Sequence, residues 1–200
     1  MRYDDTPDRA FYREPRLVEH IDAGAIAAVE QLYRECLPPG GCVLDLMSSW
    51  VSHLPAEVAY ERVVGLGMNA IELAANPRLD AYVVHDLNAA PQLPFGAADF
   101  DAVTLCVSIQ YLTQPVLVLR DAARVCRPHA PLAISFSNRC FPTKAVAVWQ
   151  ALGGRGHCEL VARYLADAGG WEAVRTLDRS ARRGDPLFAV IARRTADGPA

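Results

Sequence analysis

The chain has 200 residues, 52% of them hydrophobic and 22% charged, which suits one compact domain and argues against a disordered chain. Its 20 basic and 23 acidic residues give a formal net charge of −3, so the composition offers no basic surface for nucleic acid. No run reaches the roughly 20 apolar residues of a membrane span, and the charged N-terminus lacks the apolar core of a signal peptide. We therefore expect a single cytoplasmic domain over residues 1–200, with no nucleic-acid or membrane partner.

The six cysteines show no C-x-x-C pairing, which argues against a zinc ribbon and a thioredoxin-like site. Four of them lie inside apolar runs, where a free thiol packs as a small hydrophobic group. Cys140 differs, because it follows a predicted strand near the expected site. We expect reduced cysteines and no metal site.

The first 38 residues are predicted to form an irregular arm followed by one helix. Pro7 and Pro15 interrupt any helix in the arm. From Arg16 onward, apolar residues recur at helical spacing as far as Cys36, and the Pro-Pro-Gly-Gly run at 38–41 ends the helix. The spacing predicts a helix over 16–36, and the segment 1–38 is a candidate lid.

Short apolar runs then alternate with helical patterns along the rest of the chain. The predicted strands lie at 42–46, 62–66, 82–85, 101–107, 132–136, 171–177 and 187–192. The predicted helices lie at 55–60, 69–75 and 115–126, from about 143, and at 158–168. Such alternation implies an α/β fold with a mostly parallel sheet and helices on both faces. The last two strands, joined by a polar turn at 182–185, predict an antiparallel edge hairpin.

In an open α/β sheet, ligands bind at the carboxyl ends of the strands. This rule selects five segments that follow apolar runs, at 45–50, 65–69, 85–88, 107–112 and 135–139. Each carries small or polar residues. We therefore expect the functional residues in these segments.

Five sequence runs in register point to a known family. They are VLDL at 43–46, VVGL at 63–66, LPF at 93–95, FDAV at 100–103 and LRDAARVCRP at 119–128. Together they resemble the class I S-adenosylmethionine-dependent methyltransferases, in particular the type 11 group, over roughly residues 40–137. The resemblance implies a Rossmann-like, seven-stranded methyltransferase sheet with its last strand antiparallel, and S-adenosylmethionine as cofactor.

The resemblance places the amino-acid part of the cofactor at the turn after the first strand, which here reads Asp45, Met47, Ser48 and Ser49. Backbone N–H groups must approach the cofactor closely there, near a helix N-terminus that favours its carboxylate. Relatives usually carry glycines at this turn. Because Met47 has a Cβ, a left-handed backbone is costly, so we expect the loop to take a different path or the cofactor to shift. The two serines either bind the carboxylate or only cap a helix.

The second strand is followed by the turn that meets the ribose in the family, and Gly65, Gly67, Met68 and Asn69 occupy it here. The family offers an acidic residue to the ribose hydroxyls. Asn69 is a neutral and weaker partner, and it also has the spacing of a helix cap with Glu72. Met68 is a candidate apolar lid on the adenine.

Four further residues are assigned to the cofactor by the resemblance. Asp86 matches the position that accepts from the adenine amino group, with the Leu87 N–H nearby, although an Asx turn is the plainer alternative. Val107 and Ser108 follow the fourth strand and are expected to face the cofactor.

The acceptor side is expected to hold Gln110, Tyr111, Asn138 and Arg139. Residues 137–144 form the least usual loop of the chain, and we expect them to shape the choice of acceptor. If the acceptor must lose a proton, His20, Tyr111 or Asp22 is a candidate base, and His20 and Tyr111 are our predicted catalytic residues.

The sequence thus predicts methyl transfer by in-line displacement to a small-molecule acceptor. The Asn-Pro-Pro-aromatic run of adenine methyltransferases is absent after the fourth strand, as is the Pro-Cys nucleophile of cytosine-C5 enzymes. The alternative is a non-catalytic module that binds S-adenosylmethionine or S-adenosylhomocysteine. A nicotinamide-dependent oxidoreductase ranks last, because no G-x-G-x-x-G follows the first strand.

Overall fold

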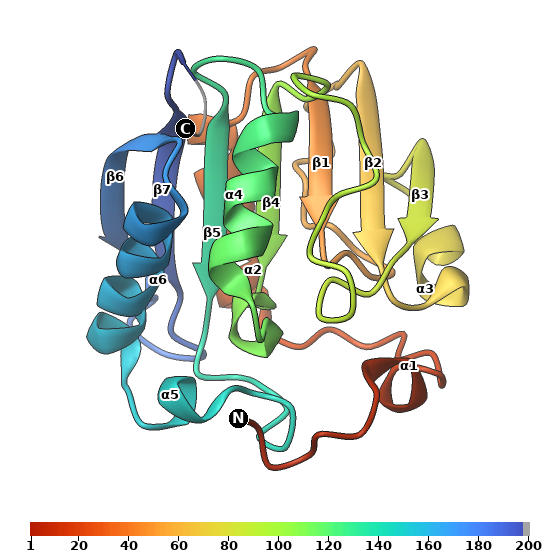
Figure 1. The fold of residues 1–200 in the computed structure, drawn as a ribbon, viewed down its shortest axis with the longest axis vertical. Helices are drawn as coiled ribbons and strands as arrows, with labels where there is room; N and C mark the ends of the chain where they lie inside the picture. Colours follow the sequence, from red (N-terminus) through yellow and green to blue (C-terminus); the bar gives the residue numbers. More distant parts are fainter. Residues whose placement is uncertain (198–200) are drawn as a thin grey trace.

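The computed structural model describes residues 1–197, which build one seven-stranded sheet in the order β3-β2-β1-β4-β5-β7-β6 (Figure 1). The strands are β1 (Cys42–Leu46), β2 (Arg62–Gly67), β3 (Ala81–Val84), β4 (Ala102–Cys106), β5 (Pro131–Phe136), β6 (Trp171–Asp178) and β7 (Phe188–Arg194). The first five pair in parallel, whereas β7 runs antiparallel to both β5 and β6. The predicted α/β fold with an antiparallel edge hairpin is confirmed.

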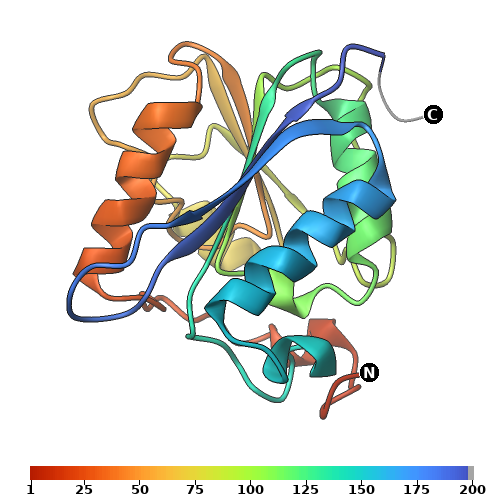
Figure 2. The same ribbon diagram turned by 90° about the vertical axis from the view of Figure 1, so that its left-hand side faces the viewer.

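Helices cover the two faces of the sheet (Figure 2). The helix α2 (Ala23–Cys36) packs on one face, and α4 (Pro115–Val125) and α6 (Gly154–Ala168) pack together on the other. The strands β1 and β5 are buried along their whole length, because both of their faces are covered. The short helices are α1 (Asp8–Phe11), α3 (Ala70–Ala75) and α5 (Ala147–Gln150), with a 3₁₀ turn at Ile109–Tyr111. No helix within residues 1–197 is long and apolar enough to cross a membrane.

Four predicted helices differ from the structure. The helix expected over 16–36 begins only at Ala23, because the Asp22 carboxylate caps it by accepting from the Ala25 N–H at 2.9 Å. The predicted helix over 55–60 does not form, and the whole connection from β1 to β2 is irregular. The helix expected from about 143 is reduced to the four residues of α5, and the next helix begins at Gly154 instead of 158.

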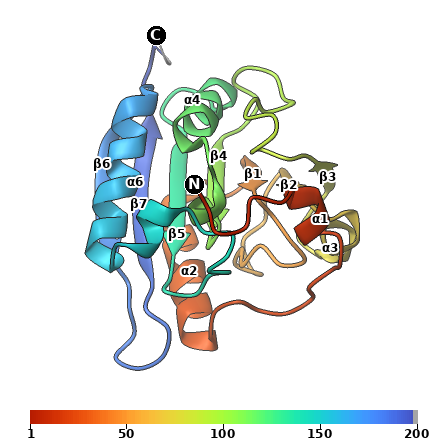
Figure 3. The same ribbon diagram turned by 60° about the horizontal axis from the view of Figure 1, so that its bottom comes forward.

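Residues 1–22 form a segment that we call the N-terminal strap. The strand arrows of Figure 1 point toward it, so it lies at the carboxyl ends of the parallel strands. In Figure 3 it runs from beside α5 to α1, near α3, and then back to the start of α2. The strap therefore crosses the edge of the sheet where the sequence places the functional residues.

Candidate functional site

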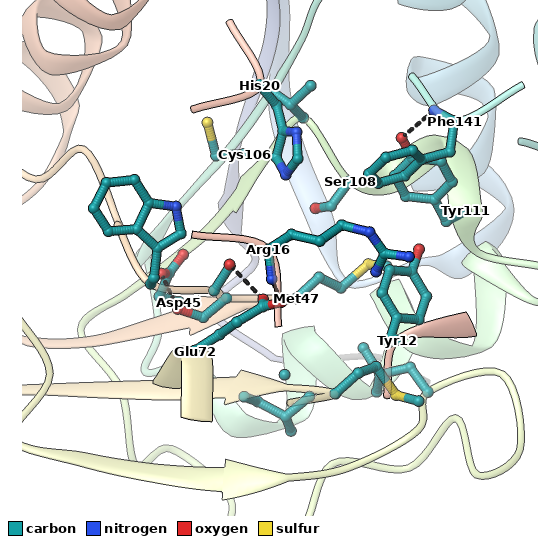
Figure 4. A pocket seen from close by; sticks show the side chains of 18 of the residues that line it. Tyr12, Arg16, His20, Asp45, Met47, Glu72, Cys106, Ser108, Tyr111 and Phe141 are labelled. Carbon is teal, nitrogen blue, oxygen red and sulfur yellow. Dashed lines mark hydrogen bonds between the residues drawn. The ribbon is translucent and has the colours of Figure 1, made fainter. Parts of the chain in front are cut away.

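A cavity of about 300 Å³ opens between the strap and the carboxyl ends of β1, β2 and β4 (Figure 4). This volume is at the lower end of the range for small-molecule sites. Predicted site residues that line it are His20, Asp45, Met47, Ser48, Ser49, Gly67, Met68, Asp86, Leu87, Val107, Ser108, Tyr111 and Arg139. Most of the residues that we predicted for the site therefore meet at one cavity.

The buried carboxylate of Asp45 organises the loop after β1. It accepts hydrogen bonds from the Ser48 hydroxyl at 2.6 Å, the Ser52 hydroxyl at 2.7 Å and the Thr104 hydroxyl at 3.0 Å. Burial raises the pKa of Asp45, and the three hydroxyl donors oppose that shift. The Ser48 hydroxyl is thus committed to Asp45, and Asp45 shapes the floor of the cavity.

The loop after β1 adopts the left-handed backbone that we expected it to avoid. Met47 has φ of 56°, and no helix follows it. The first of our two alternatives, that its Cβ would force another path, was wrong: the chain accepts a left-handed residue, which costs about 1–2 kcal/mol. The second alternative, a shifted cofactor, stays a prediction. Val107 and His53 also have positive φ, at 49° and 50°, and both line the cavity. Strained residues thus gather around this hollow, as they do at functional sites.

The absence of a helix after β1 removes a feature that the family resemblance implied. A helix N-terminus would have offered partial positive charge to an anion at this turn. Instead, Ser49 donates from its hydroxyl to Glu72 at 2.6 Å. Within residues 1–197, the turn after β1 thus carries no helix dipole for a carboxylate.

Glu72, in the first turn of α3, lines the cavity and was not predicted as a site residue. Its carboxylate accepts from the Ser49 hydroxyl and, at 2.7 Å, from the backbone N–H of Arg16. The capping-box spacing from Asn69 to Glu72 drew attention to the pair, but only as a helix cap. The acidic side chain lies one turn beyond the position where the family offers its ribose acid.

Two predicted residues around β2 are used for packing and do not line the cavity. The side-chain oxygen of Asn69 caps α3 by accepting from the N–H groups of Ile71 and Glu72. The side-chain NH₂ of Asn69 donates to the backbone carbonyls of Tyr12 and Arg13. Its role as a ribose partner is therefore not supported by its position, whereas its role as a cap is confirmed. Gly65 leaves room for Leu79, whose Cδ1 would lie 2.4 Å from an added Cβ.

Gly67, by contrast, lines the cavity and permits a close backbone approach. A Cβ at this position would lie 2.2 Å from the Ser48 carbonyl oxygen, and Ser48 N donates to the Leu66 carbonyl at 2.8 Å. Glycine is therefore required where the loop after β1 crosses the end of β2.

Asp86 lies in the Asx turn that was the plainer alternative. Its Oδ1 accepts from the N–H groups of Asn88 at 3.0 Å and Ala89 at 3.2 Å. Its Oδ2 takes no hydrogen bond from the residues that the structure describes, and Asp86 and Leu87 both line the cavity. The turn and a ligand contact are compatible.

On the far side of the cavity, Tyr111 accepts from the N–H of Phe141 through its hydroxyl at 2.9 Å. Burial raises the pKa of Tyr111 to about 12, so the phenol is protonated at neutral pH and is poorly suited to act as a base. Gln110 is fully buried and donates to the Val107 carbonyl, so it does not reach the cavity as predicted. Ser108 lines the cavity, and its hydroxyl is buried without a partner among the described residues.

Of the remaining candidates, His20 lines the cavity, with its ring edge-to-face on Phe141 at 5.3 Å. Partial burial lowers the pKa of His20, so its imidazole is neutral at pH 7. Asp22 does not line the cavity. Its carboxylate caps α2 and accepts from the backbone N–H of Asp185, whose carboxylate in turn accepts from the backbone N–H of Asp22. Arg139 lines the cavity edge and binds Asp185 at 2.7 Å, whereas Asn138 is exposed outside the cavity.

The strap is fastened by side chains that come from the rest of the fold. Lys144, fully buried, donates to the Thr6 carbonyl at 2.7 Å and lies 3.2 Å from the carboxylates of both Asp4 and Asp8. The Trp50 indole donates to the Val18 carbonyl at 3.0 Å. Together with Asn69 and Glu72, these groups hold the strap over the cavity.

Comparisons with known proteins agree with this architecture. Residues 40–134 match the family model described as a methyltransferase domain. No curated protein sequence matches the chain.

Three solved structures illustrate the likeness of fold. The (4+2)-cyclase SpnF has a TM-score of 0.66 at 15% identity, covering 94% of this chain and 91% of its own. A putative methyltransferase bound to the Trm112 activator of Haloferax volcanii has a TM-score of 0.65 at 14% identity, covering 86% and 90%. Phosphoethanolamine N-methyltransferase 2 of Haemonchus contortus, in complex with S-adenosylhomocysteine, has a TM-score of 0.61 at 12% identity, covering 84% and 52%.

The family match spans β1 to β5, and the sheet order is the one that the resemblance implied. The cavity lies at the carboxyl ends of the strands within that match. Residues 40–134 are therefore similar in sequence to the type 11-like methyltransferase domain, and the sheet that they help to build has the class I methyltransferase fold.

Proposed function

We propose that this cavity binds S-adenosylmethionine and that the chain transfers its methyl group to a small-molecule acceptor. The observation that carries the proposal is Ser108, a residue of the cavity lining whose buried hydroxyl has no partner among residues 1–197. A buried hydroxyl without a partner is unfavourable, so its presence at the carboxyl end of β4 favours a polar ligand there.

The residues of the cavity fit S-adenosylmethionine, but the glycine and the acidic residue lie at other positions than in the family. Gly67 supplies the close backbone approach that glycines after β1 supply in relatives, and Asp86, which lines the cavity, has one carboxylate oxygen without a hydrogen bond from the described residues. We assign the adenosine to Gly67, Met68, Asp86 and Leu87. Glu72 takes the place of the ribose acid, because it is the acidic residue that follows β2 into the cavity.

When bound, S-adenosylmethionine supplies a methyl group already activated by its sulfonium. The protein then has to align an acceptor with that methyl group and exclude water. The strap covers the cavity, which suits the role of a lid predicted for residues 1–38. Neutral His20 is the better proton acceptor, because Tyr111 holds its own proton at neutral pH.

Calorimetry with S-adenosylhomocysteine tests cofactor binding, with NAD as the negative control. Ser108→Ala is expected to weaken S-adenosylhomocysteine about 3- to 10-fold, which corresponds to one ordinary hydrogen bond of 0.5–1.5 kcal/mol. The matched variant is Ser135→Ala. Its hydroxyl is also buried without a partner but lies in β5 outside the cavity lining, so no change in affinity is expected. Equal losses in the two variants would contradict the assigned site.

A non-catalytic binding module is the second candidate, and one observation favours it. Ser48, Ser49, Asn69 and Glu72, which lie where the family holds its cofactor, are all engaged within the protein. Methylated product from any member of an acceptor panel would exclude this candidate. Tight binding of S-adenosylhomocysteine with no product from the whole panel would support it.

A further inference from the structure

Arg16 places a cation in the cavity without a counter-ion. Its Nη2 donates to the Phe11 carbonyl at 2.9 Å, whereas its Nη1 is buried and takes no hydrogen-bond acceptor from the described residues. A guanidinium keeps its charge in proteins and presents its donors as a planar fork. One arm of that fork is therefore unsatisfied in a residue that lines a ligand-sized cavity.

Two acidic side chains that line the same cavity, Asp8 and Glu72, are committed elsewhere. Asp8 binds Arg2 and Lys144, and Glu72 accepts from Ser49 and from the backbone N–H of Arg16 itself. Among residues 1–197, no carboxylate lies within ion-pair distance of the Arg16 guanidinium. A partly buried cation without an anion is unfavourable, so this site selects for a negatively charged ligand group.

Aromatic rings surround the same guanidinium. Its carbon lies 4.5 Å from the centre of the Phe11 ring, 5.4 Å from that of Phe141 and 5.9 Å from that of Tyr12. Tyr111 lies beside Phe141, with ring centres 5.8 Å apart. Cation–π contacts hold the guanidinium in place without neutralising it, and the rings offer flat apolar faces to a ligand.

The side chain reaches the acceptor half of the cavity. The Arg16 backbone is hydrogen-bonded to Glu72 on α3, at the side assigned to the nucleoside. From there the side chain runs toward Tyr12 in Figure 4, and its guanidinium contacts Phe141 in the loop after β5. Tyr111, at the end of the loop after β4, and the loop after β5 are the part of the site assigned to the acceptor. The positive charge of the Arg16 guanidinium therefore lies beside the residues assigned to the acceptor.

We propose that Arg16 binds a carboxylate on the methyl acceptor, and that the acceptor is a small aromatic carboxylic acid whose ring packs among Tyr12, Tyr111 and Phe141. This inference rests on the proposed methyl transfer for the identity of the ligand as acceptor. The same guanidinium chemistry would also suit the carboxylate in the amino-acid part of the cofactor. The experiment therefore has to distinguish the two carboxylates.

Calorimetry on the full chain loaded with S-adenosylhomocysteine uses benzoate as the probe and benzamide as its neutral analogue. We expect benzoate to bind at least 10-fold tighter than benzamide, and Arg16→Gln to remove that preference. Arg16→Lys, which keeps the charge but not the fork, is expected to restore part of it. The matched control is Arg13→Gln, an exposed arginine three residues earlier in the strap, which should change nothing.

A second titration compares S-adenosylhomocysteine with 5′-methylthioadenosine, a nucleoside that lacks the carboxylate. Arg16→Gln is expected to leave the affinities for both within about twofold. Selective loss of S-adenosylhomocysteine affinity would overturn the proposal and assign Arg16 to the cofactor. Equal binding of benzoate and benzamide by the wild-type protein would overturn it as well. If S-adenosylhomocysteine fails to bind the wild type, the proposed function fails instead, and benzoate titration of the unloaded protein still decides the carboxylate preference.

Discussion

The close approach of the β1 loop to the end of β2 gives the sharpest quantitative prediction. In Gly67→Ala, the new Cβ would lie 2.2 Å from the Ser48 carbonyl oxygen and 3.1 Å from Leu73 Cδ2. The first neighbour is backbone, so it cannot rotate away, and the loop itself must move. Overpacking of this kind costs about 1–3 kcal/mol, and the upper end applies because the loop is also held by Asp45.

Two other glycines make a graded series with Gly67. In Gly65→Ala the closest neighbour, at 2.4 Å, is the end of the flexible Leu79 side chain, so we expect a loss of about 1 kcal/mol. In Gly96→Ala nothing lies within 4 Å of the new Cβ, so the free energy of unfolding should stay equal or rise by about 0.5 kcal/mol.

Urea unfolding at fixed m-value measures the series. For a chain of this size, a loss of about 3 kcal/mol in Gly67→Ala corresponds to a fall in Tm of about 6–12 °C. Gly67→Ala should also weaken S-adenosylhomocysteine more than Gly65→Ala does, because only Gly67 lines the cavity. Equal stability losses at 67 and 96 would refute the claim that the loop after β1 rests on the end of β2.

Three further predictions concern the strap and the site. Lys144→Met removes the buried ammonium that Asp4 and Asp8 share and leaves Asp8 with Arg2 alone, so proteolysis within residues 1–12 should accelerate at least 10-fold while α2 and the sheet stay protected from hydrogen exchange. Glu72→Gln keeps an acceptor but removes the charge, so S-adenosylhomocysteine should bind about 10-fold more weakly with little change in Tm. If neutral His20 takes the acceptor proton, the rate should be flat around pH 7 and fall as pH drops through its lowered pKa, below 6.5, and His20→Gln should abolish that acid limb. An unchanged pH profile in His20→Gln would exclude this role.

The parallel core could be predicted because its physics is local. Runs such as 43–46 and 132–136 are buried on both faces, so all but one residue in each is apolar and the runs are recognisable without knowledge of their neighbours. The cap at Asn69 follows from spacing alone, and the structure confirms it. The cavity could be located because the carboxyl ends of parallel strands meet at one edge.

The roles of individual site residues depend on partners far away in sequence, so they could not be predicted. Glu72 meets the backbone N–H of Arg16, 56 residues earlier, and no local pattern contains that contact. The helix predicted over 16–36 failed for a related reason. Leu17 and Val18 are exposed. The irregular backbone around them is held by hydrogen bonds to the Trp50 indole and the Glu72 carboxylate, and the apolar periodicity of the segment does not encode these contacts.

In the proposed site, the strap and the cofactor share the Glu72 carboxylate, so we expect cofactor binding to be coupled to motion of the strap. Glu72 accepts from Arg16 N and Ser49 in the structure described here, and a ribose hydroxyl that bonds to the same carboxylate must share or displace these donors. Each displaced hydrogen bond subtracts about 0.5–1.5 kcal/mol from the binding free energy unless the released N–H finds another acceptor. The strap variant Lys144→Met does not touch Glu72, so it should loosen the cover without removing the carboxylate. Faster association of S-adenosylhomocysteine in that variant, with dissociation accelerated at least as much, is the signature of a cover that must open before the nucleoside enters.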